Sequence, residues 1–99
     1  MYYFFCRLNP PRPTFAQDMS PEERELMQRH AMYWKALMDQ GKVIVFGPVA
    51  DPHGGWGAAV LQLEHPDEAS RHTSGDPVIV AGRGFSYEVL PMPRAVLPG

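Results

Sequence analysis

Three segments of the chain are apolar at almost every position, and this feature limits what the chain can fold into. The segments are 2–8 (YYFFCRL), 42–49 (KVIVFGPV) and 56–63 (WGAAVLQL), and they contain many of the aromatic and β-branched residues that favour strands. Side chains of a strand point alternately to its two faces, so both faces of each of these strands would be apolar. A sheet that contains all three therefore needs a cover on both sides.

The stretch between the first two of these strands predicts one long helix. Ser20 can cap its start, Pro21 suits the first helical position, and Glu23 completes a capping box. Gly41 supplies a C-terminal stop, so the helix should end near Gln40. The proline-rich stretch that precedes the helix is expected to be a loop.

The remaining segments complete a single domain. A shorter helix is expected within 66–75, the segment 78–82 (VIVAG) is compatible with a helical turn or a strand, and 85–92 (FSYEVLPM) predicts the last strand. The resulting order β-α-β-β-α-β is that of a ferredoxin-like split unit, an α+β fold with a four-stranded antiparallel sheet. We expect the domain to span 1–99, with 92–99 as an extended, proline-rich tail.

Two helices cover only one face of such a sheet. The other face would expose more apolar area than the roughly few hundred Å² that a soluble monomer usually tolerates. A second copy of the chain is the simplest cover, so we expect a face-to-face homodimer in which two sheets enclose one barrel-like core. The alternative is a monomer whose proline-rich tail folds over the uncovered face.

Composition argues against several classes of protein. The net charge is −2 and the basic residues are scattered, which argues against nucleic-acid binding. No apolar stretch approaches the ~20 residues of a transmembrane helix, so no membrane association is expected. The first residues lack the features of a signal peptide, and a single cysteine, Cys6, allows no internal disulfide. We therefore expect a cytoplasmic protein.

One residue on the apolar stripe of the long helix is unusual for a core. His30 lies on this stripe, at a position where a leucine would pack better. Its neighbours on the stripe are Leu26, Met27, Tyr33, Trp34 and Leu37. Imidazole changes its protonation state near neutral pH, and a positioned histidine base typically contributes ~10²–10⁴ in rate. His30 is thus a candidate general base; the alternative is a half-buried histidine that is hydrogen-bonded to the backbone.

Four motifs occur in order along nearly the whole chain. They are QRHAMYWKAL (28–37), GKVIVFGPVAD (41–51), GGWGAAV (54–60) and GDPVIVAG…YEVLP (75–91). Together they resemble the YCII-related family of the dimeric α/β-barrel superfamily. The resemblance implies a ferredoxin-like dimer, and metal-free lyase- or dehalogenase-like chemistry on hydroxylated aromatic compounds. The long insert 9–23 and the pair Tyr33-Trp34 depart from the short typical members.

The resemblance also implies a site formed by a histidine on the first helix and an aspartate after the second. These residues are His30 and Asp76 here, and Asp76 would orient the His30 ring through one nitrogen and leave the other for a ligand. Pro77 follows Asp76, so the alternative is an aspartate that only caps the next turn. The two roles are compatible because a carboxylate has two oxygens. Sequence spacing does not bring His30 and Asp76 together; only the expected fold does.

Aromatic residues of the strands and the long helix are candidates for substrate binding. Tyr3 and Trp34 are expected nearest to His30, and Phe5 would add a ring to a flat apolar pocket. Arg7 could meet an anionic group of a substrate. The alternative is that the rings are simply core and that the arginine is exposed.

No metal or cofactor site is predicted. His53, His65 and His72 form no HxH or HxxxH pair, and the chain contains no CxxC. The glycine-rich segment 51–57 (DPHGGWG) follows no strand-to-helix pattern, so it indicates a hairpin turn rather than a phosphate loop. Cys6 is interpreted as a small buried hydrophobe.

The sequence therefore favours a small enzyme without a cofactor, in which a His30–Asp76 dyad moves a proton on a small, aromatic or enolisable substrate. Elimination, isomerisation or dehalogenation would all fit such a base. The alternative is a non-catalytic small-molecule-binding or sensor module that uses the same pocket. A purely structural interaction protein is a third hypothesis, and it predicts no cavity beside His30.

Overall fold

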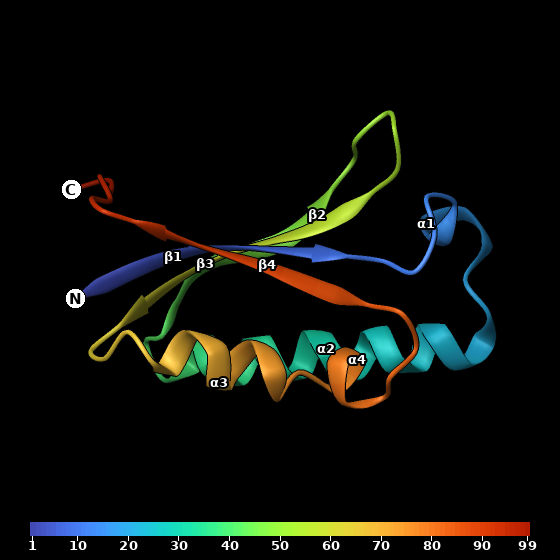
Figure 1. The fold of residues 1–99 in the computed structure, drawn as a ribbon, viewed down its shortest axis with the longest axis horizontal. Coiled ribbons are helices and arrows are strands. Elements are labelled where there is room, and N and C mark those ends of the chain that lie inside the picture. The colour runs from blue at the N-terminus through green and yellow to red at the C-terminus, as the bar shows by residue number, and fades with distance from the viewer.

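The chain folds into two layers, with a twisted sheet lying over a set of helices (Figure 1). The computed structural model describes residues 1–99. The elements in chain order are β1 (Tyr2–Asn9), α1 (Phe15–Asp18), α2 (Pro21–Asp39), β2 (Val43–Val49), β3 (Trp56–Leu63), α3 (Glu68–Ser74), α4 (Pro77–Val80) and β4 (Ser86–Met92). This is the ferredoxin-like α+β fold that the sequence predicts.

All strand pairs in the sheet are antiparallel, and the strand order is β2-β3-β1-β4. β1 lies between β3 and β4, so that Cys6 is opposite Ala59 on one side and Val89 on the other. Cys6 and Leu8 are buried against the helices, because the even-numbered residues of β1 face the helical layer. The odd-numbered residues of β1 therefore face away from it.

The long helix α2 begins and ends close to where its sequence signals place it. The Ser20 hydroxyl accepts a hydrogen bond from the Glu23 backbone, and the Glu23 carboxylate accepts one from the Ser20 backbone, so the predicted capping box is present. α2 ends at Asp39, and Gly41 takes a φ of 78° in the following turn, where glycine is unstrained. None of the helices is both long and apolar enough to span a membrane.

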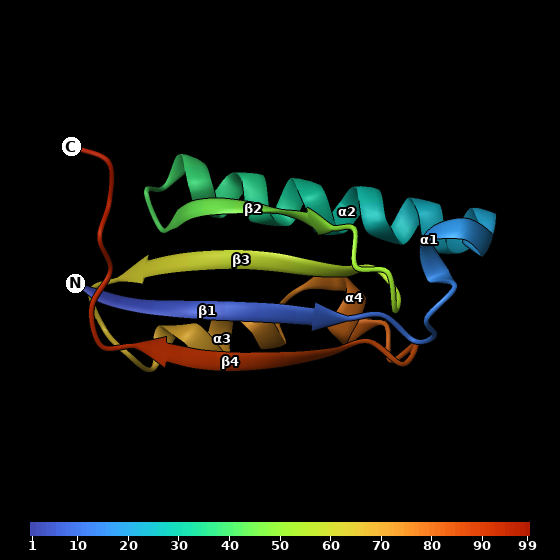
Figure 2. The same cartoon turned by 90° about the horizontal axis from the view of Figure 1, so that it is seen from above.

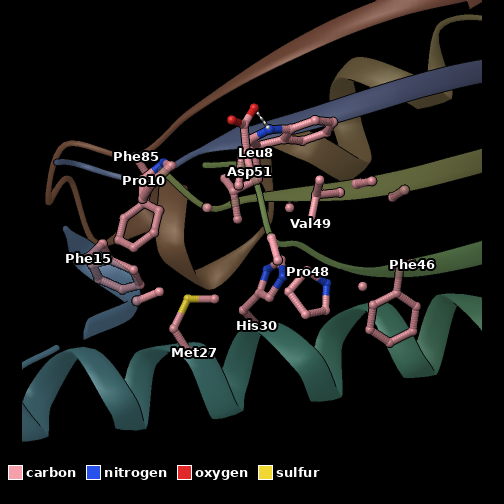
Figure 3. A pocket seen from close by; sticks show the side chains of 18 of the residues that line it. Leu8, Pro10, Phe15, Met27, His30, Phe46, Pro48, Val49, Asp51 and Phe85 are labelled. Atoms are coloured by element: carbon pink, nitrogen blue, oxygen red, sulfur yellow. Dashed lines mark hydrogen bonds between the residues drawn. The ribbon is translucent and has the colours of Figure 1, made fainter. Parts of the chain in front are cut away.

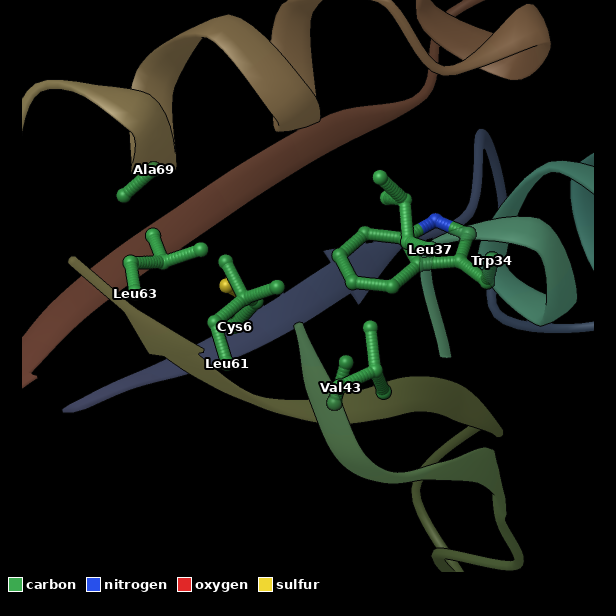
Figure 4. Close-up of a cluster of buried hydrophobic side chains, with 8 residues drawn as sticks. Cys6, Trp34, Leu37, Val43, Leu61, Leu63 and Ala69 are labelled. Carbon is green, nitrogen blue, oxygen red and sulfur yellow. The ribbon is translucent and has the colours of Figure 1, made fainter. Parts of the chain in front are cut away.

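The main core lies between α2, α3 and the sheet (Figure 4). Its buried members are Cys6, Trp34, Leu37, Val43, Ala59, Leu61, Leu63 and Ala69. Trp34 is the largest of them, and truncation of a buried indole typically costs ~3–5 kcal/mol. Burial raises the pKa of the Cys6 thiol to about 12, which keeps it protonated and unreactive, in line with its interpretation as a buried hydrophobe.

The proline-rich segment 9–19, expected to be a loop, contains the single helical turn α1. Phe15 of this turn is buried. Arg12 fastens the segment to the start of α2, because its guanidinium donates to Asp18 Oδ1 at 2.7 Å and to both carboxylate oxygens of Glu23 at 2.8 and 2.9 Å. These ion pairs order a stretch whose composition alone predicts only an irregular connection.

The other face of the sheet carries no helix, and Figure 2 looks onto it. Its apolar side chains, here termed the open face, include Tyr3, Phe5, Val45, Trp56, Val60 and Leu90. Val45 and Leu90 are 54% and 56% exposed. The tail after β4 stays at the end of the sheet where the N-terminus lies (Figures 1 and 2). Neither the helices nor the tail therefore covers the open face.

Candidate active site

His30 and Asp76 meet within the fold although they are 46 positions apart in sequence. His30 projects from the inner side of α2, and Asp76 stands at the start of α4. His30 Nδ1 lies 2.7 Å from Asp76 Oδ2, and the side chains are 15% and 0% exposed, respectively. The structure thus brings to direct hydrogen-bond distance the two side chains that the sequence singled out.

The start of α4 explains why the Asp76 carboxylate is fixed. Asp76 is the N-cap of this turn: its Oδ1 accepts a hydrogen bond from the Val78 backbone at 3.0 Å, and Pro77 takes the first helical position. The VIVAG segment is therefore a helical turn and not a strand. Because capping uses Oδ1, the second oxygen remains available for His30, and one carboxylate serves both purposes.

Two further donors converge on the same oxygen, Oδ2. The Trp34 indole nitrogen donates to it from α2 at 2.8 Å, and the Tyr87 hydroxyl donates to it from β4 at 2.5 Å. Together with His30 and the backbone of Val78, they surround Asp76 with four donors in a site closed to solvent. Hydrogen bonds to an ionised acceptor are the stronger kind, so the carboxylate is held rigidly.

The protonation state of Asp76 follows from these contacts. Burial raises the pKa of the carboxyl, but the hydrogen bonds from His30, Tyr87 and Trp34 outweigh it and bring the pKa below its usual value. The carboxylate is therefore ionised at neutral pH and can only accept hydrogen bonds. His30 Nδ1 must then carry a proton, which leaves Nε2 as the acceptor nitrogen of the neutral ring.

The His30 ring lies in the wall of a cavity of about 560 Å³ (Figure 3). The cavity is bounded by α2, α1 and the β2–β3 hairpin, and 16 of its 25 lining residues are hydrophobic. Side chains around the ring include Phe15, Met27, Phe46, Pro48, Val49 and Phe85. Sites for small molecules commonly have volumes of roughly 300–1,000 Å³ and a mainly apolar lining. Because Nδ1 is bonded to Asp76, Nε2 is the nitrogen left for a ligand.

Of the four residues that the sequence assigned to substrate binding, only Trp34 lines this cavity. The centre of its indole lies 6.4 Å from that of the His30 ring. Its buried position and its bond to Asp76 place it behind the histidine, where it holds the carboxylate.

Tyr3, Phe5 and Arg7 lie on the open face instead, and the expectation that Tyr3 lies beside His30 is corrected by the structure. The reason is the alternation of side chains along β1, which turns odd-numbered residues away from α2. The Arg7 guanidinium stacks over the Trp56 ring at 4.2 Å from its centroid and lies 3.7 Å from Glu88. Its charge therefore interacts with groups on the open face and not with the cavity.

Several residues of the site were not singled out in the sequence. The only sequence feature that indicates a role for Tyr87 is its position on the inward face of the YEVLP strand. Phe15 and Phe85 come from opposite ends of the chain and meet edge to face, with ring centroids 5.2 Å apart. Their contact depends on the path of α1, which no local pattern predicts.

The remaining histidines stand apart from this site. His53 is almost fully exposed in the β2–β3 turn, His65 precedes α3, and His72 lies in α3 beside Glu68 rather than beside Asp76. The chain contains no group of three or more His, Cys, Asp or Glu side chains placed to hold a metal ion.

Comparison with known proteins connects this geometry to a family. The family model described as YCII-related domain matches residues 3–93. A solved structure of similar fold is the 5-chloro-2-hydroxyhydroquinone dehydrochlorinase TftG from Burkholderia phenoliruptrix AC1100, in complex with 2,5-dihydroxybenzoquinone. The two are 21% identical with a TM-score of 0.59, over 87% of this chain and 89% of that one, a likeness that shows the fold. No curated protein matches the chain.

Proposed function

The chain belongs to the family of YCII-related domains, and we propose that it is an enzyme that moves a proton on a small hydroxylated or enolisable compound without a cofactor. In this proposal Nε2 of His30 is the general base. Asp76 is the residue that positions it, and Trp34 and Tyr87 hold the carboxylate in place. The substrate occupies the cavity beside the His30 ring.

The proposed reaction starts with transfer of a proton from an O–H or C–H group of the substrate to Nε2. The ring then carries a proton on each nitrogen, and the negative charge of Asp76 stabilises the resulting cation. The electron pair left on the substrate either expels a leaving group such as chloride or takes the proton back at another atom. The first outcome is an elimination and the second an isomerisation, and neither consumes a further reactant.

The observation that carries this proposal is the set of donors around Asp76. Four donors fix the carboxylate, and those of His30, Tyr87 and Trp34 lower its pKa. The ionised carboxylate in turn requires the proton of the neutral His30 ring to lie on Nδ1. The other nitrogen is the base lone pair that proton transfer requires, and it belongs to a ring in the wall of a ligand-sized cavity. The fold shared with a dehydrochlorinase supports the elimination class.

The test compares two histidine variants on hydroxylated aromatic compounds, beginning with 5-chloro-2-hydroxyhydroquinone and release of chloride. His30→Gln should lower kcat by ~10²–10⁴, because the base is lost while the side chain remains polar. His72→Gln is the matched control, since it removes an imidazole outside the cavity, and it should leave kcat unchanged. Equal activity of wild type and His30→Gln would contradict the proposal.

The second candidate is a small-molecule-binding or sensor module that uses the same cavity. The apolar lining favours it, since binding of an apolar ligand requires no proton transfer. It predicts that a compound raises the melting temperature of wild type and of His30→Gln alike and is recovered unchanged. The enzyme proposal predicts conversion by wild type only.

We extend the proposal to a homodimer built across the open face. The exposed Val45 and Leu90, together with a tail that leaves the face uncovered, support a second copy of this 99-residue domain as the cover. Leu90→Glu should halve the mass seen by sedimentation at micromolar concentration, and an exposed control, Met32→Glu on the outer side of α2, should not. A wild-type monomer would contradict the proposed homodimer.

We also propose that the protein is cytoplasmic, because its single, buried cysteine, Cys6, suits a reducing compartment.

A further inference from the structure

We propose that the cavity beside His30 binds uncharged ligands and rejects carboxylates and phosphates. The ligand class is a flat apolar molecule that carries one weakly acidic hydroxyl group. The proposal rests on the proposed function only for the position of the reacting group at His30. The selection by charge concerns binding and is measured without turnover.

The lining of the cavity contains no lysine and no arginine. Its only carboxylic acid is Asp51, in the turn after β2, and its only titratable base is His30. The Cys6 thiol and the Tyr87 hydroxyl also line the cavity, and burial raises the pKa of both, so they stay neutral. Asp51 accepts hydrogen bonds from the His53 backbone at 2.8 Å and from the Trp56 indole at 3.0 Å, which hold the pKa of its carboxyl below the usual value. The Asp51 carboxylate is therefore ionised; it lies 3.4 Å from the exposed His53 ring, and the lining itself offers a ligand no lysine or arginine.

Protonation of His30 does not supply the missing positive charge. The ring is bonded to the ionised Asp76 at 2.7 Å, so a protonated His30 and its partner together carry no net charge. An anion bound at Nε2 would give the set of His30, Asp76 and ligand a net negative charge in a mainly apolar site. Transfer of an unpaired charge into such surroundings is unfavourable, whereas a neutral hydroxyl loses little because Nε2 accepts its hydrogen bond.

Arg12 and Arg83, which flank the lining segments of α1 and of the loop before β4, are committed to acids elsewhere. Arg12 is bound to Asp18 and Glu23, and these same bonds hold α1 in place as a wall of the cavity. Arg83 pairs with Glu22 at 3.0 Å on the surface. Recruitment of Arg12 to a ligand would break four hydrogen bonds and release α1, so it offers no substitute for a lining cation.

The walls that α1 and the loop before β4 contribute are apolar as well. Phe15 is buried and packs edge to face on Phe85, and Met19 completes this side of the lining. Across the cavity lie Phe46 and Pro48 of β2 (Figure 3). Flat rings and a proline offer contact to the faces of an aromatic ligand and nothing to an ionic group.

The test measures binding of 2-naphthol, 2-naphthoate and methyl 2-naphthoate at pH 7 by their fluorescence. The first and third are neutral and the second is an anion of nearly the same shape as its ester. Wild type should bind the two neutral compounds at least tenfold more tightly than the anion. Equal affinity for 2-naphthoate, or no measurable binding of any of the three, would overturn the proposal.

A cation introduced into the lining should reverse the preference. Met27 lies one turn before His30 on α2 and lines the cavity, so Met27→Lys should favour the anion, whereas Met27→Gln should retain the wild-type order. Gln17→Lys, at an exposed lining position, provides a second variant whose folding is not in question. An unchanged preference in both lysine variants would contradict selection by charge.

His30→Gln separates this proposal from the proposed function. The variant should retain the preference for neutral compounds while it loses turnover. If wild type converts no substrate but prefers the neutral ligands, the enzyme proposal fails and the selection by charge stands. If turnover depends on His30 but the anion binds equally well, only the selection by charge fails.

Discussion

Two histidines of this chain that are shielded from water each lie beside a carboxylate, and only one of the pairs has the geometry of a site. His30 Nδ1 is 2.7 Å from Asp76 Oδ2, whereas His72 Nε2 is 3.6 Å from Glu68 Oε1 within one helix. Both pairs are largely shielded from water. Proximity of an imidazole to an acid in a shielded place is therefore common to both and does not distinguish them.

The difference lies in the other partners of each carboxylate. Glu68 is engaged by the Lys42 ammonium at 3.2 Å and by the His65 backbone at 3.1 Å, and it forms no hydrogen bond with the His72 ring. His72 Nε2 is a buried atom without a hydrogen-bond partner. Asp76 has no lysine or arginine partner and is fixed by the donors of His30, Trp34, Tyr87 and the Val78 backbone. A dyad is thus defined by what holds the acid and by which nitrogen it leaves for a ligand.

The largest expected effect is on stability. Asp76→Ala removes a helix cap and leaves the Trp34 indole and the Tyr87 hydroxyl without an acceptor in the core, which should lower the free energy of unfolding by about 3 kcal/mol or more. Glu68→Ala should cost clearly less, because its partners lie nearer the surface. Urea denaturation of both variants measures the difference, and equal losses would remove the contrast between the two acids.

An intermediate effect is expected in acid. Because the folded-state pKa of Asp76 is depressed, its contribution to stability is complete above the ordinary carboxyl pKa of ~4 and is lost as the pH falls through the folded value. Wild type should therefore lose more unfolding free energy between pH 5 and pH 3 than Asp76→Asn does. The other depressed carboxyls, such as Glu23, cancel in this comparison. Parallel curves for the two proteins would show that the fold does not lower the pKa of Asp76.

The smallest effect concerns the second histidine. Burial, and then the charge of Lys42, lower the pKa of His72. Its contribution to stability is accordingly complete above the ordinary histidine pKa of ~6.5 and is lost as the pH falls below that value. Proton NMR should show the His72 ring titrating below its usual range, and Lys42→Met should raise that pKa. A normal value in wild type would indicate that the ring is more open to water than its packing suggests.

The sequence predicts local structure well because its signals are local. The capping box of Ser20 and Glu23 and the stop at Gly41 define α2, and Asp76-Pro77 gives a capped turn. The contact between His30 and Asp76 could be predicted only from the expected fold, and the family resemblance supported that fold. The sequence of β1 does not indicate which of its faces packs against α2, because both faces are apolar.

Sequence analysis missed two residues of the site, Tyr87 and Phe15, for a related reason. Tyr87 is part of the site because β4 pairs with β1 in a particular register. Phe15 is part of it because four hydrogen bonds of Arg12 direct α1 over the cavity. Neither register nor loop path leaves a periodic signal in sequence. Arg7 illustrates the converse, since a strand arginine suggests an anion site until its contact with Trp56 is known.

The most direct measurement is nitrogen-15 NMR of the His30 ring near neutral pH, with the signals assigned by comparison with His30→Gln. An ionised Asp76 that accepts from Nδ1 predicts that the neutral ring carries its proton on Nδ1, with Nε2 unprotonated and shifted when a ligand occupies the cavity. A neutral ring protonated on Nε2 instead would contradict the account, since the nitrogen turned to the ligand would then have no lone pair to act as a base.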